Sequence, residues 1–211
     1  KDEEPPPDPG VTISEDDAAD LIGNAVAGGL TTNGLTQQVT EAASVAGGGF
    51  LTKALFDTVI VRQRSVGVYS YRYTFRYSYD FFKAGDSLAF LYTMKGTYDT
   101  PRMSSDDSAA ASLSVTHILP PDTVYHINGS YLRLGTQGSK VRGRNQFSST
   151  LTMTFDDIRI GKSGRKILGG QLSVTFSARN TTGTSFAYAG VLTMFGDQYA
   201  SLILNNLTYD V

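Results

Sequence analysis

Aromatic side chains recur at every second position from Tyr69 to Phe81, and this pattern limits the folds open to the chain. Successive side chains of a β-strand point to opposite faces, so the rings share one face and polar residues share the other. The run is also longer than a usual strand of about five or six residues. It predicts an unusually tall two-faced sheet, or a strand with a bend or a β-bulge. The rings are Tyr69, Tyr71, Tyr73, Phe75, Tyr77, Tyr79 and Phe81.

Alternation continues along the chain and predicts a β body over residues 64–211. Leu151, Met153 and Phe155 alternate with threonines, which is typical of a strand with one apolar face and one hydroxyl face. Short turn-forming segments separate such runs, so the fold class is mainly β, an antiparallel meander of about eight long strands. A meander of this kind closes as a barrel, folds into two layers, or stays open and curved with helices on its concave side, and the sequence leaves these arrangements open. The expected strands are 65–82, 87–98, 112–119, 124–134, 147–158, 167–178, 185–195 and 199–209.

The first 48 residues have a different character. Residues 1–12 combine acids with prolines and predict an extended tether that cannot bury enough surface to fold. Ser14 and Asp17 form a capping-box-like helix start, and apolar residues follow at helical spacing. A second helix is expected over 35–46, with small apolar residues on one side. We therefore expect one domain over residues 13–211, with a helical segment at 13–48 packed on the sheet.

The tyrosine row is the main candidate for a binding surface. The simplest assembly lays the aromatic face against the apolar faces of the other strands, so that the rings form the core. Phenol hydroxyls need hydrogen-bond partners, however, and five tyrosines in one row are many for a dry core. The alternative is a partly wet cleft for a lipid, a glycan or another amphipathic ligand. Its candidate residues are Tyr69, Tyr71, Tyr73, Tyr77 and Tyr79.

The residues offer little catalytic chemistry. The chain has no cysteine, which excludes a thiol nucleophile and a thiolate metal site. His117 and His126 flank a short Pro-Pro turn, and a four-residue loop would make them direct cross-strand neighbours able to share a metal ion. The acid pairs Asp106–Asp107 and Asp156–Asp157 could serve glycoside cleavage or bind calcium, but at strand ends such pairs are typical of solvated turns. A glycan-active enzyme would need two acids about 5 to 10 Å apart in a cleft. The sequence thus predicts a protein that is not an enzyme and carries no cofactor.

Charge is distributed unevenly along the chain. Residues 1–20 hold one lysine against eight acids, a balance of −7, which leaves +5 for the remainder of a chain whose net charge is −2. The body is only mildly basic and has no RNA-binding motif, so we expect no nucleic-acid partner. No apolar run approaches the roughly 18 residues of a membrane-spanning helix. The oligomeric state is left open.

Three features of the chain carry a resemblance: an acidic, proline-bearing leader, the phrases "SEDDAADLIGNAVAGG" and "GLTQQVTEAASVA", and a body rich in Ser, Thr and Tyr. Together they resemble the mature part of uncharacterised secreted or outer-membrane lipoproteins of Bacteroidetes type. The resemblance spans nearly the whole chain and includes no catalytic motif. It implies a lipidated cysteine just before Lys1, contact with the membrane only through that N-terminal lipid anchor, and a location that is periplasmic, anchored to the outer membrane or on the cell surface. It implies no activity.

Two main hypotheses about function follow. The first is a non-enzymatic cell-envelope lipoprotein domain that binds an amphipathic ligand or an envelope component. The second is a structural or adhesive surface module with no small ligand, in which the tyrosine row is simply core. An occupied apolar cavity favours the first hypothesis and a solid interior favours the second.

Overall fold

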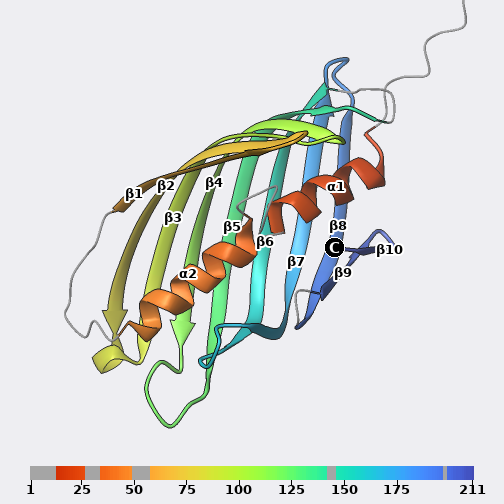
Figure 1. Ribbon diagram of the computed structural model, residues 1–211. Coiled ribbons are helices and arrows are strands. Elements are labelled where there is room, and N and C mark those ends of the chain that lie inside the picture. Colours follow the sequence, from red (N-terminus) through yellow and green to blue (C-terminus); the bar gives the residue numbers. More distant parts are fainter. Residues whose placement is uncertain (1–12, 27–33, 49–57, 142–145, 197–198) are drawn as a thin grey trace, which may run out of the picture.

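The computed structural model describes residues 13–26, 34–48, 58–141, 146–196 and 199–211. Two N-terminal helices lie against one large antiparallel sheet (Figure 1). The predicted tether at 1–12 lies outside the described residues.

Both helices begin and end close to the predicted positions. Helix α1 spans Glu15–Val26 and helix α2 spans Leu35–Gly47. The predicted capping box of α1 is present: the Asp17 amide donates to Ser14 Oγ at 3.1 Å, and the Ser14 amide donates to Asp17 Oδ2 at 3.3 Å. In the part of the chain that the structure describes, neither helix has the length and apolar content needed to cross a bilayer.

The sheet has ten strands in sequence order, each antiparallel to its neighbours. The meander is therefore confirmed, and among the described strands β1 and β10 form two separate edges, so the sheet is open. A short 3₁₀ turn, η1 (Lys83–Gly85), joins β2 to β3. The strands are β1 (Thr58–Val66), β2 (Tyr69–Phe82), β3 (Ser87–Asp99), β4 (Met103–Thr116), β5 (Val124–Ser139), β6 (Gln146–Gly161), β7 (Ile167–Asn180), β8 (Ser185–Gly196), β9 (Tyr199–Leu204) and β10 (Leu207–Asp210).

The prediction of about eight strands was too low for two reasons. The strand expected over 65–82 corresponds to β2, but the chain reverses at Gly67, and β1, of which only the last two residues fall in the expected strand, pairs with β2 as a hairpin. The strand expected over 199–209 is also a hairpin, which turns at Asn205 and Asn206, both with positive φ. β2 itself runs 14 residues, of which Ser70 to Phe82 pair with β3 in unbroken register, so the long aromatic run reflects a tall sheet and contains no bulge.

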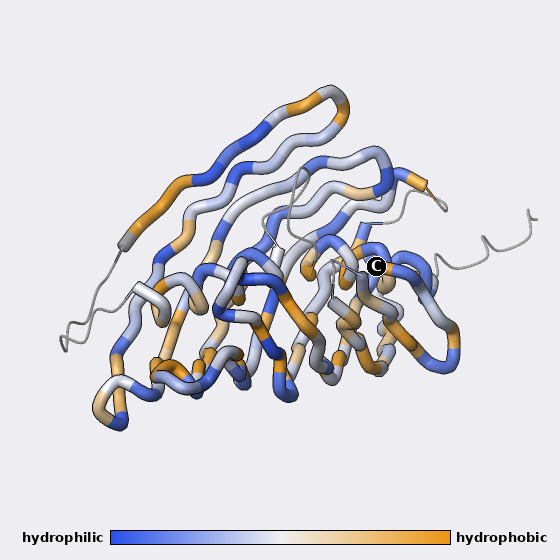
Figure 2. The backbone as a smooth tube through the Cα atoms, turned by 60° about the horizontal axis from the view of Figure 1, so that its bottom comes forward, coloured by the Kyte–Doolittle hydropathy of each residue, from blue (hydrophilic) through white to orange (hydrophobic). Residues whose placement is uncertain are grey.

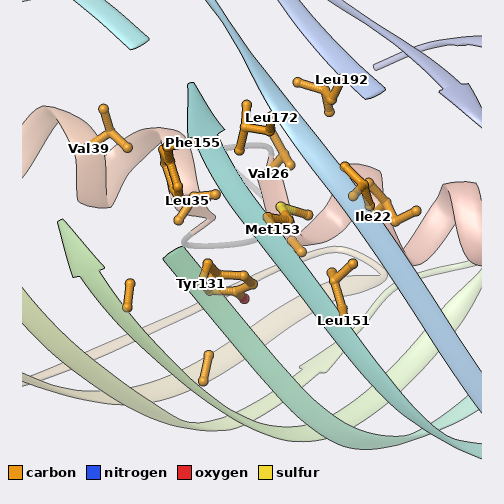
Figure 3. Close-up of a cluster of buried hydrophobic side chains, with 14 of the residues drawn as sticks. Ile22, Val26, Leu35, Val39, Tyr131, Leu151, Met153, Phe155, Leu172 and Leu192 are labelled. Carbon is orange, nitrogen blue, oxygen red and sulfur yellow. The ribbon is translucent and has the colours of Figure 1, made fainter. Parts of the chain in front are cut away.

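The sheet bends into an arch, and the helices lie on its concave side (Figures 1 and 2). In β2 to β7 and in β9, alternate side chains point toward the helices and most of them are buried, while those between them face outward and are mostly exposed. Ile22 and Val26 of α1, with Leu35 and Val39 of α2, pack close to inward-facing residues such as Met153 (Figure 3). This single core holds the helices on the sheet.

Polar contacts also tie the helices to the sheet at several places. In α2, Gln38 Oε1 accepts a hydrogen bond from the Tyr77 hydroxyl at 2.8 Å, and Glu41 pairs with Arg62. Asp17 of α1 accepts from Ser139 at 3.2 Å. Further contacts of the α1 segment are the Asp20–Arg102 ion pair, the hydrogen bond from Tyr209 to Asp16, and the one from Tyr188 to the Ile13 carbonyl.

Candidate functional site

The five predicted tyrosines all lie in β2 on the concave face, but they differ in accessibility. Tyr73 and Tyr77 are only 2% and 7% exposed, beneath the helices. Tyr71 and Tyr79 are half-buried, and Tyr69, at the end of the strand, is 39% exposed. The middle of the row is therefore core, while its ends reach the rim of the arch.

A buried ion pair occupies the centre of the concave face. Arg133 of β5 and Asp107 of β4 are diagonal neighbours across the two strands, and Arg133 Nη2 donates to Asp107 Oδ2 at 2.5 Å. Their side chains are 4% and 0% exposed. Since a buried pair repays its lost hydration only when its remaining polar atoms are also satisfied, its surroundings decide what it contributes.

Hydrogen bonds extend this pair across three strands. Ser149 Oγ donates to Gln137 Oε1 at 2.7 Å, Gln137 Nε2 donates to Ser105 Oγ at 3.1 Å, and Ser105 Oγ donates to Asp107 Oδ2 at 2.7 Å. We call these five residues, Ser105, Asp107, Arg133, Gln137 and Ser149, the Arg133 network. It forms a polar centre within a face that is otherwise aromatic and aliphatic.

Two glycines make room for the Asp107 carboxylate. In register, Asp107 lies opposite Gly96 of β3 on one side and Gly135 of β5 on the other. A Cβ at Gly96 would lie 2.6 Å from Cδ1 of the Tyr73 ring, and one at Gly135 would lie 2.6 Å from Gln137 Nε2. The glycines therefore let the ring and the amide close around the acid.

Buried tyrosines surround Arg133. Its guanidinium lies 5.4 Å from the centre of the Tyr98 ring. Burial raises the pKa of Tyr98 and of Tyr131 to about 12, although the Arg133 charge lowers both pKa values in part. Burial alone would lower the pKa of Arg133, but Asp107 and the adjacent phenols raise it well above its ordinary value. Arg133 therefore keeps its positive charge.

Two polar atoms of the network have no hydrogen-bond partner among the described residues, namely Arg133 Nε and Asp107 Oδ1. Arg133 also lines a small cavity of about 10 Å³ between the sheet and the helices, together with Tyr73, Tyr92 and Tyr131. Asn24 of α1 and Leu35 of α2 cover this cavity. Within the described residues, buried side chains of α1 and α2 pack against the centre of the arch.

The predicted histidine pair is brought together, although not in the expected register. Thr116, rather than His117, lies opposite His126, because His117 adopts a positive φ beyond the end of β4. The two imidazole rings are nevertheless 4.4 Å apart between centroids. His126 Nδ1 lies 2.5 Å from Asp157 Oδ1. Within the described residues, no group of three or more His, Cys, Asp or Glu has an arrangement suited to a metal ion.

The sequence reasoning missed the Arg133 network. Asp107 was treated with Asp106 as part of an acidic pair, and Arg133 was treated only as part of a strand. The informative signal is register: Asp107 alternates in step with Ala111 and Val115, and Arg133 follows Tyr131 by two positions, so both charged residues fall on the apolar face. A charge at an inward position of an alternating strand marks a buried polar centre.

No known protein family, curated protein or solved structure matches this chain.

Proposed function

We propose that the chain is a non-enzymatic, exported binding domain of the cell envelope. We further propose that the space between the concave face of its sheet and the two helices, which we call the trough, binds an amphipathic ligand. The resemblance to envelope lipoproteins supports the location. The observation that carries the binding proposal is the Arg133 network, a polar centre with an unpaired donor and an unpaired acceptor inside an apolar trough. Such a centre is costly to bury and gives a ligand head group a place to bind.

The two unpaired atoms define the head group. Arg133 Nε offers an N–H donor and Asp107 Oδ1 offers a lone pair. A neutral group that both donates and accepts, such as a hydroxyl or an amide, satisfies both atoms. A charged head would be opposed by one member of the ion pair. The tyrosine rings and neighbouring aliphatic side chains would contact the apolar tail.

The ligand can enter only when the helices move away from the sheet, because their side chains fill the trough. The contacts of α1 suggest a direct way to prevent this movement. A Cβ at Gly23 would lie 2.8 Å from Cγ1 of Val211, close enough for an engineered disulfide between Gly23→Cys and Val211→Cys. The chain has no cysteine of its own, so this bond would form without competition.

The experiment titrates the full chain with monodecanoylglycerol, a neutral amphiphile, by isothermal calorimetry, with decanoate as the anionic comparison of equal chain length. We expect the neutral amphiphile to bind more tightly than decanoate. Oxidation of the cysteine pair should weaken binding at least about tenfold, and dithiothreitol should restore it. Native mass spectrometry of protein purified from a bacterial envelope would show whether a ligand is retained. Absence of binding by the reduced protein would refute the proposal.

The alternative hypothesis, a structural or adhesive module with no small ligand, is favoured by one observation: the enclosed cavity beside Arg133 measures only about 10 Å³. In that case the oxidised and reduced proteins should both fail to bind either amphiphile. The ion pair would then serve only to fix the register of the central strands.

A further inference from the structure

A groove runs along the outer face of the sheet. Most of its lining residues face outward, although four residues of the Arg133 network, Ser105, Asp107, Gln137 and Ser149, also border it. Three adjoining hollows of about 840, 730 and 500 Å³ lie along it and share lining residues. Asp106 and Thr136 line the first two hollows, and Lys95, Ser108 and Leu134 line the last two. The hollows are therefore parts of one long groove.

Strand register shows how the groove runs. Its central row passes from β1 to β8 through directly opposed, outward-facing residues, so the groove crosses the strands. These residues are Gln63, Arg72, Thr97, Asp106, Thr136, Ser148, Arg179 and Ser185. A parallel row on one side ends at Gly138 and Gln146, and another passes through Lys95, Ser108, Leu134 and Thr150.

Two properties of the sheet hollow out this face. Neighbouring strands are twisted by about 20 to 25°, so a strongly curved sheet is saddle-shaped and its outer face is concave along one diagonal. Half of the side chains in the central row are also short hydroxyls, which leave that curvature unfilled. The two described helices both lie on the opposite face (Figure 1), so neither covers the groove.

The lining identifies the class of ligand. Arg72, Arg76, Lys95 and Arg179 bring positive charge, while Asp99 and Asp106 bring negative charge. The cationic side chains would repel a polycation, and the two aspartates would repel a polyanion where it passes them. In the two larger hollows Leu134 is the main apolar side chain pointing outward, so these two lack the apolar pockets that fix an extended peptide. The third hollow is more apolar, since Val59, Leu132 and Leu134 line it.

A neutral polyhydroxyl chain fits these features. Sugar hydroxyls donate and accept at once, and serine, threonine, glutamine, arginine and aspartate side chains supply the complementary groups. Strands lie about 4.8 Å apart, and the groove meets one new side chain at each strand. This regular spacing suits a polymer of repeating rings. We infer that the outer groove binds a linear, uncharged glycan, independently of any ligand in the trough.

The test measures binding of cellohexaose, chitohexaose and maltohexaose to the full chain by ligand-observed NMR and calorimetry. The matched variants are Thr136→Tyr, which fills the groove, and Thr154→Tyr, which adds the same ring to the outer face of β6 outside the three hollows. Both positions are exposed, and tyrosine is well tolerated in strands.

We expect at least one hexasaccharide to bind, Thr136→Tyr to weaken it at least about tenfold, and Thr154→Tyr to leave it unchanged. Asp106→Ala should also weaken binding, and raising the salt concentration should have little effect because the ligand is uncharged. The inference is overturned if none of the three sugars binds, or if both tyrosine variants weaken binding equally. Binding of a heparin hexasaccharide alone, lost at high salt, would also overturn it, because it would reflect only the cationic side chains.

Discussion

The Arg133–Asp107 pair allows a quantitative test of how the centre of the sheet is built. Replacing Arg133 with Met leaves the fully buried Asp107 carboxylate without its cation. Replacing Asp107 with Leu leaves the guanidinium equally isolated. Each single change should lower the free energy of unfolding by about 3 to 5 kcal/mol, because one charge then remains buried and unpaired.

The double variant Asp107→Leu/Arg133→Met should behave differently. It removes both charges and replaces them with apolar groups of similar size, which is often neutral or stabilising for a buried pair. We expect its stability to lie within about 1 kcal/mol of the parent, so that the two single losses are strongly non-additive. Urea unfolding at pH 7, followed by circular dichroism and tyrosine fluorescence, measures all four proteins. Single losses below about 1 kcal/mol, or a double loss equal to their sum, would refute this account.

Three other predictions follow from burial and capping. Tyr73→Ala should destabilise the protein by about 3 to 5 kcal/mol and Tyr69→Ala by less than about 1 kcal/mol, measured by the same urea assay; equal losses would contradict the assignment of the middle of the row to the core. Ser14→Ala should cost about 1 kcal/mol by removing the helix cap, and Ser14→Asp should restore most of it. Burial raises the pKa of three phenols to about 12, whereas tyrosine in the unfolded chain ionises near pH 10. Between about pH 10 and pH 12 the unfolded state therefore binds fewer protons than the folded state. Stability should therefore fall from about pH 10 to about pH 12, by up to about 1.4 kcal/mol per pH unit for each tyrosine, and a flat thermal midpoint over this range would contradict the reasoning. The three tyrosines are Tyr77, Tyr98 and Tyr131.

Sequence periodicity predicted most of the fold because the central strands each have one buried face. The meander, both helices and the common face of the tyrosine row all follow from alternation and helical spacing. The first half of β4 was missed, since its serines, acids and alanines provide little apolar contrast. At the outer edges, β1 was missed except for its last two residues, and the β9–β10 hairpin was merged into a single strand, because Asn205–Asn206 reverse the chain in only two residues while the alternation continues on each side.

The candidate sites were harder to predict than the fold. The tyrosines are recognisable from local spacing, but which of them are covered depends on helices more than 20 residues away in sequence, as the 39-residue separation of Gln38 and Tyr77 illustrates. The Arg133 network depends on the pairing of three strands, and the outer groove depends on the saddle shape of the whole sheet. Such features require knowledge of register and curvature, which single-strand patterns do not contain.

The arrangement of helices and sheet also orders the events of folding. Every strand pairs with the next one in sequence, so the sheet can grow hairpin by hairpin with short loop closures. The α1 segment is different: it precedes the sheet, yet Asp16 bonds to Tyr209, 193 residues later, and Ile13 accepts from Tyr188, 175 residues later. Its docking therefore closes the longest loops in the molecule and waits for the last strands. A chain that emerges N-terminus first would hold α1 unpacked until synthesis or export is nearly complete, whereas α2 could already contact Arg62 and Tyr77 in the first two strands.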